Sequence, residues 1–184
     1  RSVPGVLNIL RKAGLCNGLV VDLGCGGGLW ARQLTDAGYR VLGIDLSPDM
    51  IALARKRVPE GSFRTGSFLD VKFPDCVAIT ALGECFNYTF DNRNSRPSLS
   101  RLFRCAFRAL RPGGLLVFDV AEPGRAQGSS RCFWEGQDWA CLTEYVQDEQ
   151  RHLLTRRITT FRRVKRQYRR AEEIHVQQLY RASQ

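Results

Sequence analysis

The 184-residue sequence predicts an α/β fold, with a doubly wound, mainly parallel sheet followed by antiparallel strands. Three observations support this prediction. Between residues 19 and 120, short apolar runs typical of strands covered on both faces alternate with helical segments. The first two runs each end in an acidic residue, Asp22 and Asp45. After Gly124 the sequence alternates and is rich in Thr, Val, Ile and Tyr, which favours antiparallel strands.

The helices and strands follow from periodicity and from the residues that end them. Helices are expected at residues 4–12, 29–37, 48–57 and 98–110, and parallel strands at residues 19–23, 40–45, 62–66, 76–82 and 115–120. Arg111-Pro112-Gly113-Gly114 is expected to end the last helix. A three-stranded antiparallel meander is expected at residues 138–147, 153–164 and 168–180. We therefore predict two domains, residues 1–124 and 125–184.

A glycine-rich turn, Gly24-Cys25-Gly26-Gly27-Gly28, follows the first strand directly. Glycine adopts positive φ at no steric cost, so a tight turn into the next helix is expected, with backbone N–H groups facing a nucleotide or a carboxylate. The spacing does not fit a dinucleotide fingerprint, because the third glycine comes one residue early. Asp22 would face a pyrophosphate, yet it could attract an ammonium group. A ligand with an amino acid at one end and a ribose at the other fits better.

The second acidic strand end lies at the distance expected for a ribose ligand. Asp45 follows Gly24 by 21 residues. In doubly wound folds a carboxylate at about this spacing binds the two ribose hydroxyls. The alternative is a solvated aspartate at the end of a strand. Ser47 and Pro48 then predict the start of a helix, with Ser47 as the N-cap.

Two motifs carry a resemblance to a known family. Asp22-x-Gly24-x-Gly26-x-Gly28 resembles the first motif of the class I S-adenosylmethionine-dependent methyltransferases. The string LRPGGLLVFDV at residues 110–120 resembles the end-of-helix and fifth-strand motif of the same family. The resemblance implies a Rossmann-like core of strand order 3-2-1-4-5, with S-adenosyl-L-methionine as cofactor and S-adenosyl-L-homocysteine as product. It further implies methyl transfer to a nitrogen or oxygen atom of a small molecule.

The resemblance implies a set of cofactor-binding residues around the carboxyl ends of the first four strands. They are Asp22, Gly24, Cys25, Gly26, Asp45, Leu46, Met50, Ser67, Phe68, Leu82 and Gly83. The first four would hold the methionine part, and Asp45 the ribose. Met50 and Phe68 would flank the adenine. Ser67 stands where the family often has an acid, so its hydroxyl or the N–H of Phe68 would serve instead.

Candidate catalytic residues are few. Methyl transfer from a sulfonium needs placement and a group that takes the proton of the acceptor. Glu84, Asn87 and Tyr88 follow the fourth strand and are expected at the reaction centre, with Glu84 orienting an amine acceptor. His175, on the third strand of the meander, is a further candidate for taking the proton, although a lone histidine is more often structural.

Charge leaves other functions open. The net charge is +10, and residues 151–170 contain nine Lys or Arg and no acidic residue. This segment is either a solvated strand face or a surface for nucleic acid, so an RNA or protein methyltransferase is one alternative. Nucleic acid is allowed but not favoured as a partner. A non-catalytic domain that binds the cofactor or a partner is the other alternative.

The remaining expectations concern the environment of the chain. The seven cysteines form no C-x-x-C pair, which argues against a zinc site and a disulfide framework. No apolar segment approaches the ~20 residues that span a bilayer, so a cytoplasmic protein without membrane contact is expected. A homodimer is compatible with the meander. Residues 180–184 resemble the helix before the family's sixth and seventh strands, which are missing, so we expect a trimmed chain or a partner chain covering the sheet edge.

Overall fold

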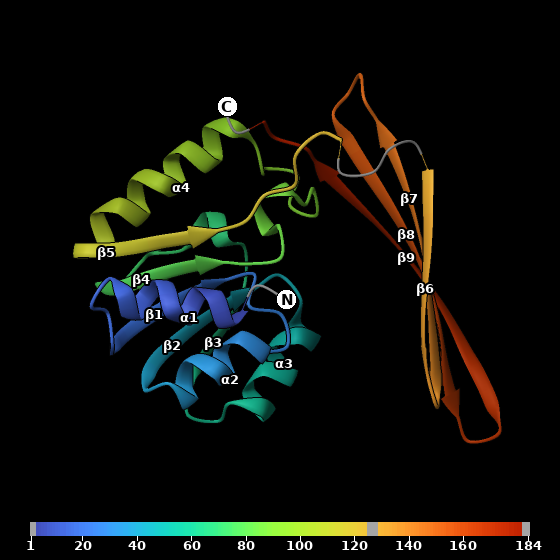
Figure 1. Cartoon of the computed structure of the whole chain (residues 1–184), viewed down its shortest axis with the longest axis horizontal. Coiled ribbons are helices and arrows are strands. Elements are labelled where there is room, and N and C mark those ends of the chain that lie inside the picture. Colours follow the sequence, from blue (N-terminus) through green and yellow to red (C-terminus); the bar gives the residue numbers. More distant parts are fainter. Residues whose placement is uncertain (1–2, 125–128, 182–184) are drawn as a thin grey trace. The chain divides into compact units, whose positions relative to one another are not determined.

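The computed structural model describes residues 3–124 and 129–181, which form two compact units (Figure 1). The first unit contains the chain up to Phe86 and Arg93–Asp119. The second contains Asn87–Asn92 and the chain from Val120 onward. The predicted boundary at residue 124 lies a few residues later, and the prediction did not assign Asn87–Asn92 to the second unit.

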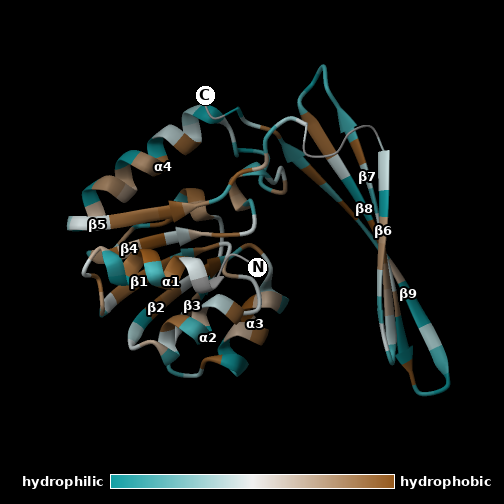
Figure 2. Ribbon diagram, viewed as in Figure 1, coloured by the Kyte–Doolittle hydropathy of each residue, from teal (hydrophilic) through white to brown (hydrophobic). Residues whose placement is uncertain are grey.

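The first unit is built on a parallel sheet of order β3-β2-β1-β4-β5, which confirms the predicted topology. The strands are β1 (Gly18–Leu23), β2 (Tyr39–Asp45), β3 (Ser62–Thr65), β4 (Cys76–Ala81) and β5 (Leu110–Phe118). Figure 2 shows apolar residues along these strands, as expected for a sheet covered on both faces. The two acidic strand ends, Asp22 and Asp45, lie on the neighbouring strands β1 and β2.

Helices bury apolar residues against this sheet. They are α1 (Val3–Lys12), α2 (Leu29–Asp36), α3 (Pro48–Arg57) and α4 (Arg96–Ala109), with short 3-10 helices η1 (Phe68–Asp70) and η2 (Cys85–Asn87). Leu10, Leu34 and Ile51, from the first three helices, share one apolar cluster with the sheet. The Ser47 hydroxyl accepts a hydrogen bond from the N–H of Met50, which confirms the predicted N-cap of α3.

The end of α4 differs from the prediction. Strand β5 starts at Leu110, whereas a turn was expected at residues 111–114 and a strand only from 115. The pairing with β4 shifts register between Cys76 and Ala78, and Gly113 has a φ of 79°. The proline and glycines therefore form an irregularity inside the strand. A Cβ at Gly114 would lie 3.0 Å from the carbonyl oxygen of Val77, so the close approach of the two strands requires glycine.

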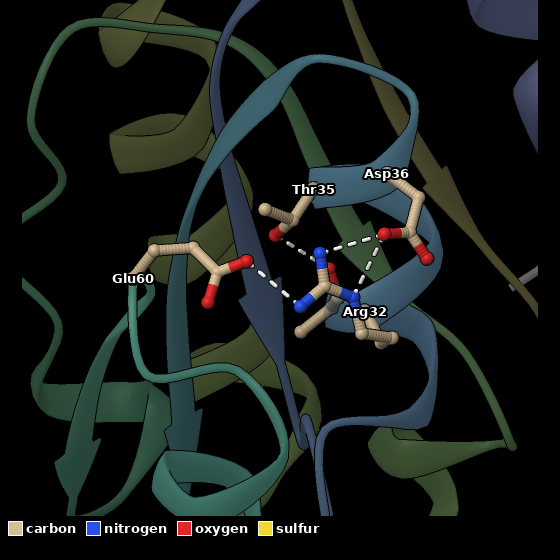
Figure 3. A network of polar contacts seen from close by, with 5 residues as sticks. Arg32, Thr35, Asp36 and Glu60 are labelled. Carbon is tan, nitrogen blue, oxygen red and sulfur yellow. Dashed lines mark hydrogen bonds and ion pairs between the residues drawn. The ribbon is translucent and has the colours of Figure 1, made fainter.

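An exposed polar network links α2 to the loop before β3 (Figure 3). Arg32 lies between two carboxylates, 2.6 Å from Asp36 and 2.7 Å from Glu60. The Thr35 hydroxyl donates to the carbonyl oxygen of Ala31. Water screens all of these charges, so this network contributes little to stability.

The second unit contains a four-stranded antiparallel sheet, one strand more than predicted. Its strands are β6 (Ser129–Gly136), β7 (Trp139–Asp148), β8 (Leu153–Val164) and β9 (Gln167–Gln178). Strand β6 was missed because every residue in it is exposed, so its sequence lacks the alternation of a half-buried strand. The predicted helix start at residues 180–184 lies largely outside the described residues.

None of the helices formed by residues 3–124 and 129–181 is long and apolar enough to cross a bilayer.

Candidate functional site

Asp22 is a buried carboxylate near the carboxyl end of β1. Only 2% of the residue is exposed. Its Oδ1 accepts a hydrogen bond from the Thr80 hydroxyl at 2.8 Å, and the indole N–H of Trp30 donates to that hydroxyl at 3.1 Å. Its Oδ2 is equally buried and has no hydrogen-bond partner among the described residues. Half of the carboxylate is thus held by the protein, and the other half is available to a donor.

Burial is the main influence on this carboxyl group. It raises the pKa of Asp22 from 3.8 to about 7, and the charge of Asp45 acts in the same direction. The hydrogen bond from Thr80 opposes both effects because it stabilises the ionised form. A buried carboxylate with an unused oxygen is stabilised by a cationic donor, and an ammonium group is a donor of that kind.

Asp45 and the glycine turn are held together by backbone hydrogen bonds. The N–H of Gly26 donates to Asp45 Oδ2 at 2.8 Å, and the N–H of Ser47 donates to Oδ1 at 2.9 Å. Cys25 N–H donates to the carbonyl oxygen of Ile44 at 3.0 Å. Gly24 and Gly26 have φ values of 66° and 51°, the left-handed conformation that the glycine spacing predicted. The structure therefore joins the turn after β1 to the acid at the end of β2.

Cys85 closes the turn from the side of β4. Its thiol lies 3.2 Å from the carbonyl oxygen of Leu23 and 3.4 Å from that of Leu82. A Cβ at Gly24 would lie 3.0 Å from the Cys85 sulfur, so a side chain here would require Cys85 to shift. Burial raises the pKa of the Cys85 and Cys25 thiols well above the usual range, so both stay protonated.

Asp119 contacts the predicted site and was missed by sequence reasoning. Its Oδ1 accepts hydrogen bonds from the N–H of Gly83 at 2.7 Å and of Glu84 at 3.0 Å. These bonds fix the turn after β4, in which Glu84 is buried and has a φ of 63°. That left-handed conformation is costly for a residue with a side chain. Asp119 thus positions Gly83 and Glu84, two of the predicted site residues.

The residues predicted to line the adenine have partners within the protein. The Ser67 hydroxyl accepts from the N–H of Leu69 at 3.0 Å and caps η1. Phe68 is buried and packs edge-on against Phe86, with ring centroids 5.6 Å apart. Met50 is 43% exposed. Ser67 is one of the residues that line a cavity of about 270 Å³ at the end of β3. Their contact with adenine stays a prediction, as does cofactor binding by Leu46, which is also exposed.

Two of the three predicted catalytic residues lie in the second unit. The Tyr88 and His175 rings contact each other at right angles, with centroids 5.7 Å apart. Glu84 belongs to the first unit. Asn87, expected at the reaction centre, is fully buried, and its side-chain amide bonds to the backbone of Ala121 and Gln178. Its role is therefore structural, which corrects that expectation. Catalysis by the other three residues stays a prediction.

Comparisons with known proteins show similarity to methyltransferases. A model of the methyltransferase domain family matches residues 21–118, more than half of the chain. The malonyl-(acyl-carrier protein) O-methyltransferase of Serratia marcescens is 31% identical over 108 residues, which cover 59% of this chain and 40% of that protein. The 18S rRNA (guanine(1575)-N(7))-methyltransferase of Saccharomyces cerevisiae is 32% identical over 110 residues, which cover 53% of this chain and 38% of that protein. The chain thus spans about two fifths of the length of these curated relatives.

A solved structure extends the similarity in fold to nearly the whole chain. The sugar N-methyltransferase KedS8 from Streptoalloteichus sp. matches with a TM-score of 0.80 and 19% sequence identity, covering 99% of this chain and 74% of that one. At this identity the match shows a shared fold. The family model covers the strands that carry Asp22, Asp45 and the glycine turn, so the chain belongs to the class I S-adenosylmethionine-dependent methyltransferase family.

Proposed function

We propose that this chain is part of an enzyme that transfers the methyl group of S-adenosylmethionine to a nitrogen or oxygen atom of a small molecule. One observation carries the cofactor part of the proposal: Oδ2 of Asp22 is buried and has no hydrogen-bond partner in the described part of the chain. The ammonium group of the cofactor's methionine part would supply the missing donor. The residues present therefore fit this cofactor.

The chain's own residues would bind and orient both ligands. Asp22 would bind the ammonium group, and Asp45, held by the N–H groups of Gly26 and Ser47, would accept from the ribose hydroxyls. When bound, the cofactor supplies an activated methyl group for in-line displacement. Glu84, Tyr88 and His175 are our candidates for orienting the acceptor and taking its proton.

The first test measures binding of S-adenosylhomocysteine by calorimetry. Asp22→Asn keeps the shape of the side chain but removes its charge, so we expect affinity to fall about 100-fold. Asp75→Asn removes the same charge from an exposed loop position and should leave affinity within about twofold. Equal affinity of the Asp22 variant and the wild type would contradict the proposed cofactor site.

A second pair of variants tests the glycine turn. Gly26 and Gly38 both have positive φ and free space where a Cβ would lie, but only Gly26 belongs to the turn. Valine at either position should destabilise the fold to a similar extent, because a β-branched residue disfavours this conformation. Loss of S-adenosylhomocysteine binding is expected for Gly26→Val alone. A radiolabelled methyl screen over amines, sugars, phenols and RNA then identifies the acceptor class.

An RNA or protein acceptor is the second candidate, because one relative acts on 18S rRNA and one segment of this chain is strongly basic. Four cations near the β8–β9 turn make no ion pair within residues 3–124 and 129–181: Arg162, Lys165, Arg166 and Arg169. Methylation of bulk RNA, with heparin retention that collapses in modest salt, would favour it. Binding of S-adenosylhomocysteine without any methyl transfer would favour a non-catalytic domain. A cytoplasmic location and a homodimer stay predictions.

A further inference from the structure

Arg156, on β8 of the second unit, is a partly buried cation without a counterion. It makes no ion pair with a carboxylate among the residues that the structure describes. One terminal nitrogen donates to the Tyr88 hydroxyl, and the guanidinium carbon lies 5.8 Å from the ring centroids of both Tyr88 and Tyr145. Its Nε is buried and has no acceptor. A partly buried charge that lacks a counterion and has one unpaired donor is costly, so this position favours an anion.

His175 lies directly opposite Arg156 on the neighbouring strand β9. Its Nε2 is 3.0 Å from a Glu173 carboxylate oxygen. Its Nδ1 is buried and, like Nε of Arg156, has no hydrogen-bond partner within the described chain. Imidazole nitrogens accept a hydrogen bond when unprotonated and donate one when protonated. Nδ1 can therefore bind either the hydroxyl or the ionised oxygen of an acidic group.

Aromatic rings pack beside Arg156 and His175. The Tyr88 and Phe90 rings are parallel, with centroids 5.1 Å apart, and the His175 ring stands perpendicular to both. The backbone of this segment is attached to β9, because the N–H of Thr89 donates to the carbonyl oxygen of Val176. Ring packing explains why Arg156 lies between two tyrosines. It does not explain why two nitrogen atoms on opposed residues are both buried and unpaired.

We propose that Arg156 and His175 form a subsite for an oxyanion, the carboxylate or phosphate group of the acceptor. Nε–H of Arg156 donates to an ionised oxygen, and Nδ1 of His175 binds a second oxygen of the same group. Glu173 orients the imidazole through Nε2. The subsite rests on the proposed function only in identifying its ligand with the methyl acceptor, because every residue in it belongs to the second unit.

The test is an NMR titration of the whole chain with inorganic phosphate and, separately, with acetate, at constant ionic strength and without cofactor. The chain has two histidines, so the ring signals of His175 can be assigned against those of His152. We expect a saturable shift of the His175 ring signals. Saturation by phosphate alone indicates a phosphorylated acceptor, whereas saturation by acetate as well indicates a carboxylate.

Matched variants separate a built subsite from general attraction of anions. Arg156→Gln should weaken the binding about tenfold or more, since a charged donor is lost. Arg162 lies on the same strand, six ladder positions beyond the pair formed by Arg156 and His175. Arg162→Gln should therefore change binding by less than about twofold. Equal weakening by both variants, or no saturable shift of His175 with either anion, would overturn the subsite.

Two further variants test the subsite if Arg156→Gln does not fold. If circular dichroism shows that Arg156→Gln is unfolded, Arg156→Lys keeps the positive charge and removes Nε, and it should still weaken binding. His175→Asn provides an independent loss of one partner. Because no cofactor is present, failure to bind S-adenosylhomocysteine would sink the proposed function and leave this titration unaffected.

Discussion

The two units place their polar groups by different means. In the first, carboxylates at strand ends are fixed by backbone groups: Asp45 accepts from the N–H of Gly26, and Asp119 from those of Gly83 and Glu84. In the second, cations and aromatic rings stand on antiparallel strands and contact one another, as Arg156 and Tyr88 do. The first environment favours a cationic ligand group and the second an anionic one. The two proposals therefore place ligand groups of opposite charge in different units.

The largest expected effect tests the burial of Asp22. Its pKa is about 7 in the folded protein against 3.8 without burial, so the folded state holds the proton more tightly. The resulting stabilisation is fully present below pH 4 and is lost as the pH rises through 7. Asp22→Asn cannot ionise, so its stability relative to wild type should increase by on the order of 4 kcal/mol between pH 4 and 9, in the absence of ligand.

Urea denaturation at a series of pH values measures this difference. Asp75→Asn serves as the control, because this exposed residue should show no comparable trend. A difference between Asp22→Asn and wild type that does not depend on pH would mean that the carboxylate is solvated. The first unit would then not hold a buried carboxylate for a cationic ligand group.

In the second unit, the buried side chain of Asn87 allows a comparable test of stability. Its amide donates to the carbonyl oxygens of Ala121 and Gln178 and accepts from the N–H of Ala121. Asn87→Ala leaves these buried groups unpaired, so we expect a loss of about 2–4 kcal/mol in the free energy of unfolding. Asn92→Ala, at an exposed position of the same segment, should cost less than about 0.5 kcal/mol.

Binding of S-adenosylhomocysteine to Asn87→Ala tests whether cofactor affinity depends on the second unit. The residues proposed to hold the cofactor's amino group and ribose belong to the first unit, so affinity should be unchanged wherever the variant is folded. A loss of S-adenosylhomocysteine affinity in the folded variant would show that cofactor binding also depends on the second unit.

The smallest effect is expected at Arg32. Both ion pairs of this residue are exposed to water, and salt screens them (Figure 3). Arg32→Met should move the urea midpoint by no more than the error of the measurement, at low and at high salt. A clear loss of stability that salt abolishes would show that this surface network contributes more than exposed pairs normally do.

Local signals allowed the first unit to be predicted better than the second. The glycine turn, Asp22 and Asp45 lie within short segments whose residue types encode tight turns and strand ends. Asp119 escaped because its role depends on N–H groups 35 and 36 residues away, a relation that no local pattern carries. Asn87 was misplaced for the same reason, since its partner Gln178 is 91 residues distant. Strand β6 offers no buried face, and so gave no alternation to detect.

The left-handed backbone at Glu84 favours glycine, whereas the proposed role of this residue requires its carboxylate. Glycine there would relieve roughly 1 kcal/mol of steric cost, but it would also remove the carboxylate. Selection for stability alone would favour glycine at this position. Selection for turnover of the proposed acceptor would retain glutamate. Libraries built on this scaffold should therefore hold residue 84 constant while the rest of the surface is varied.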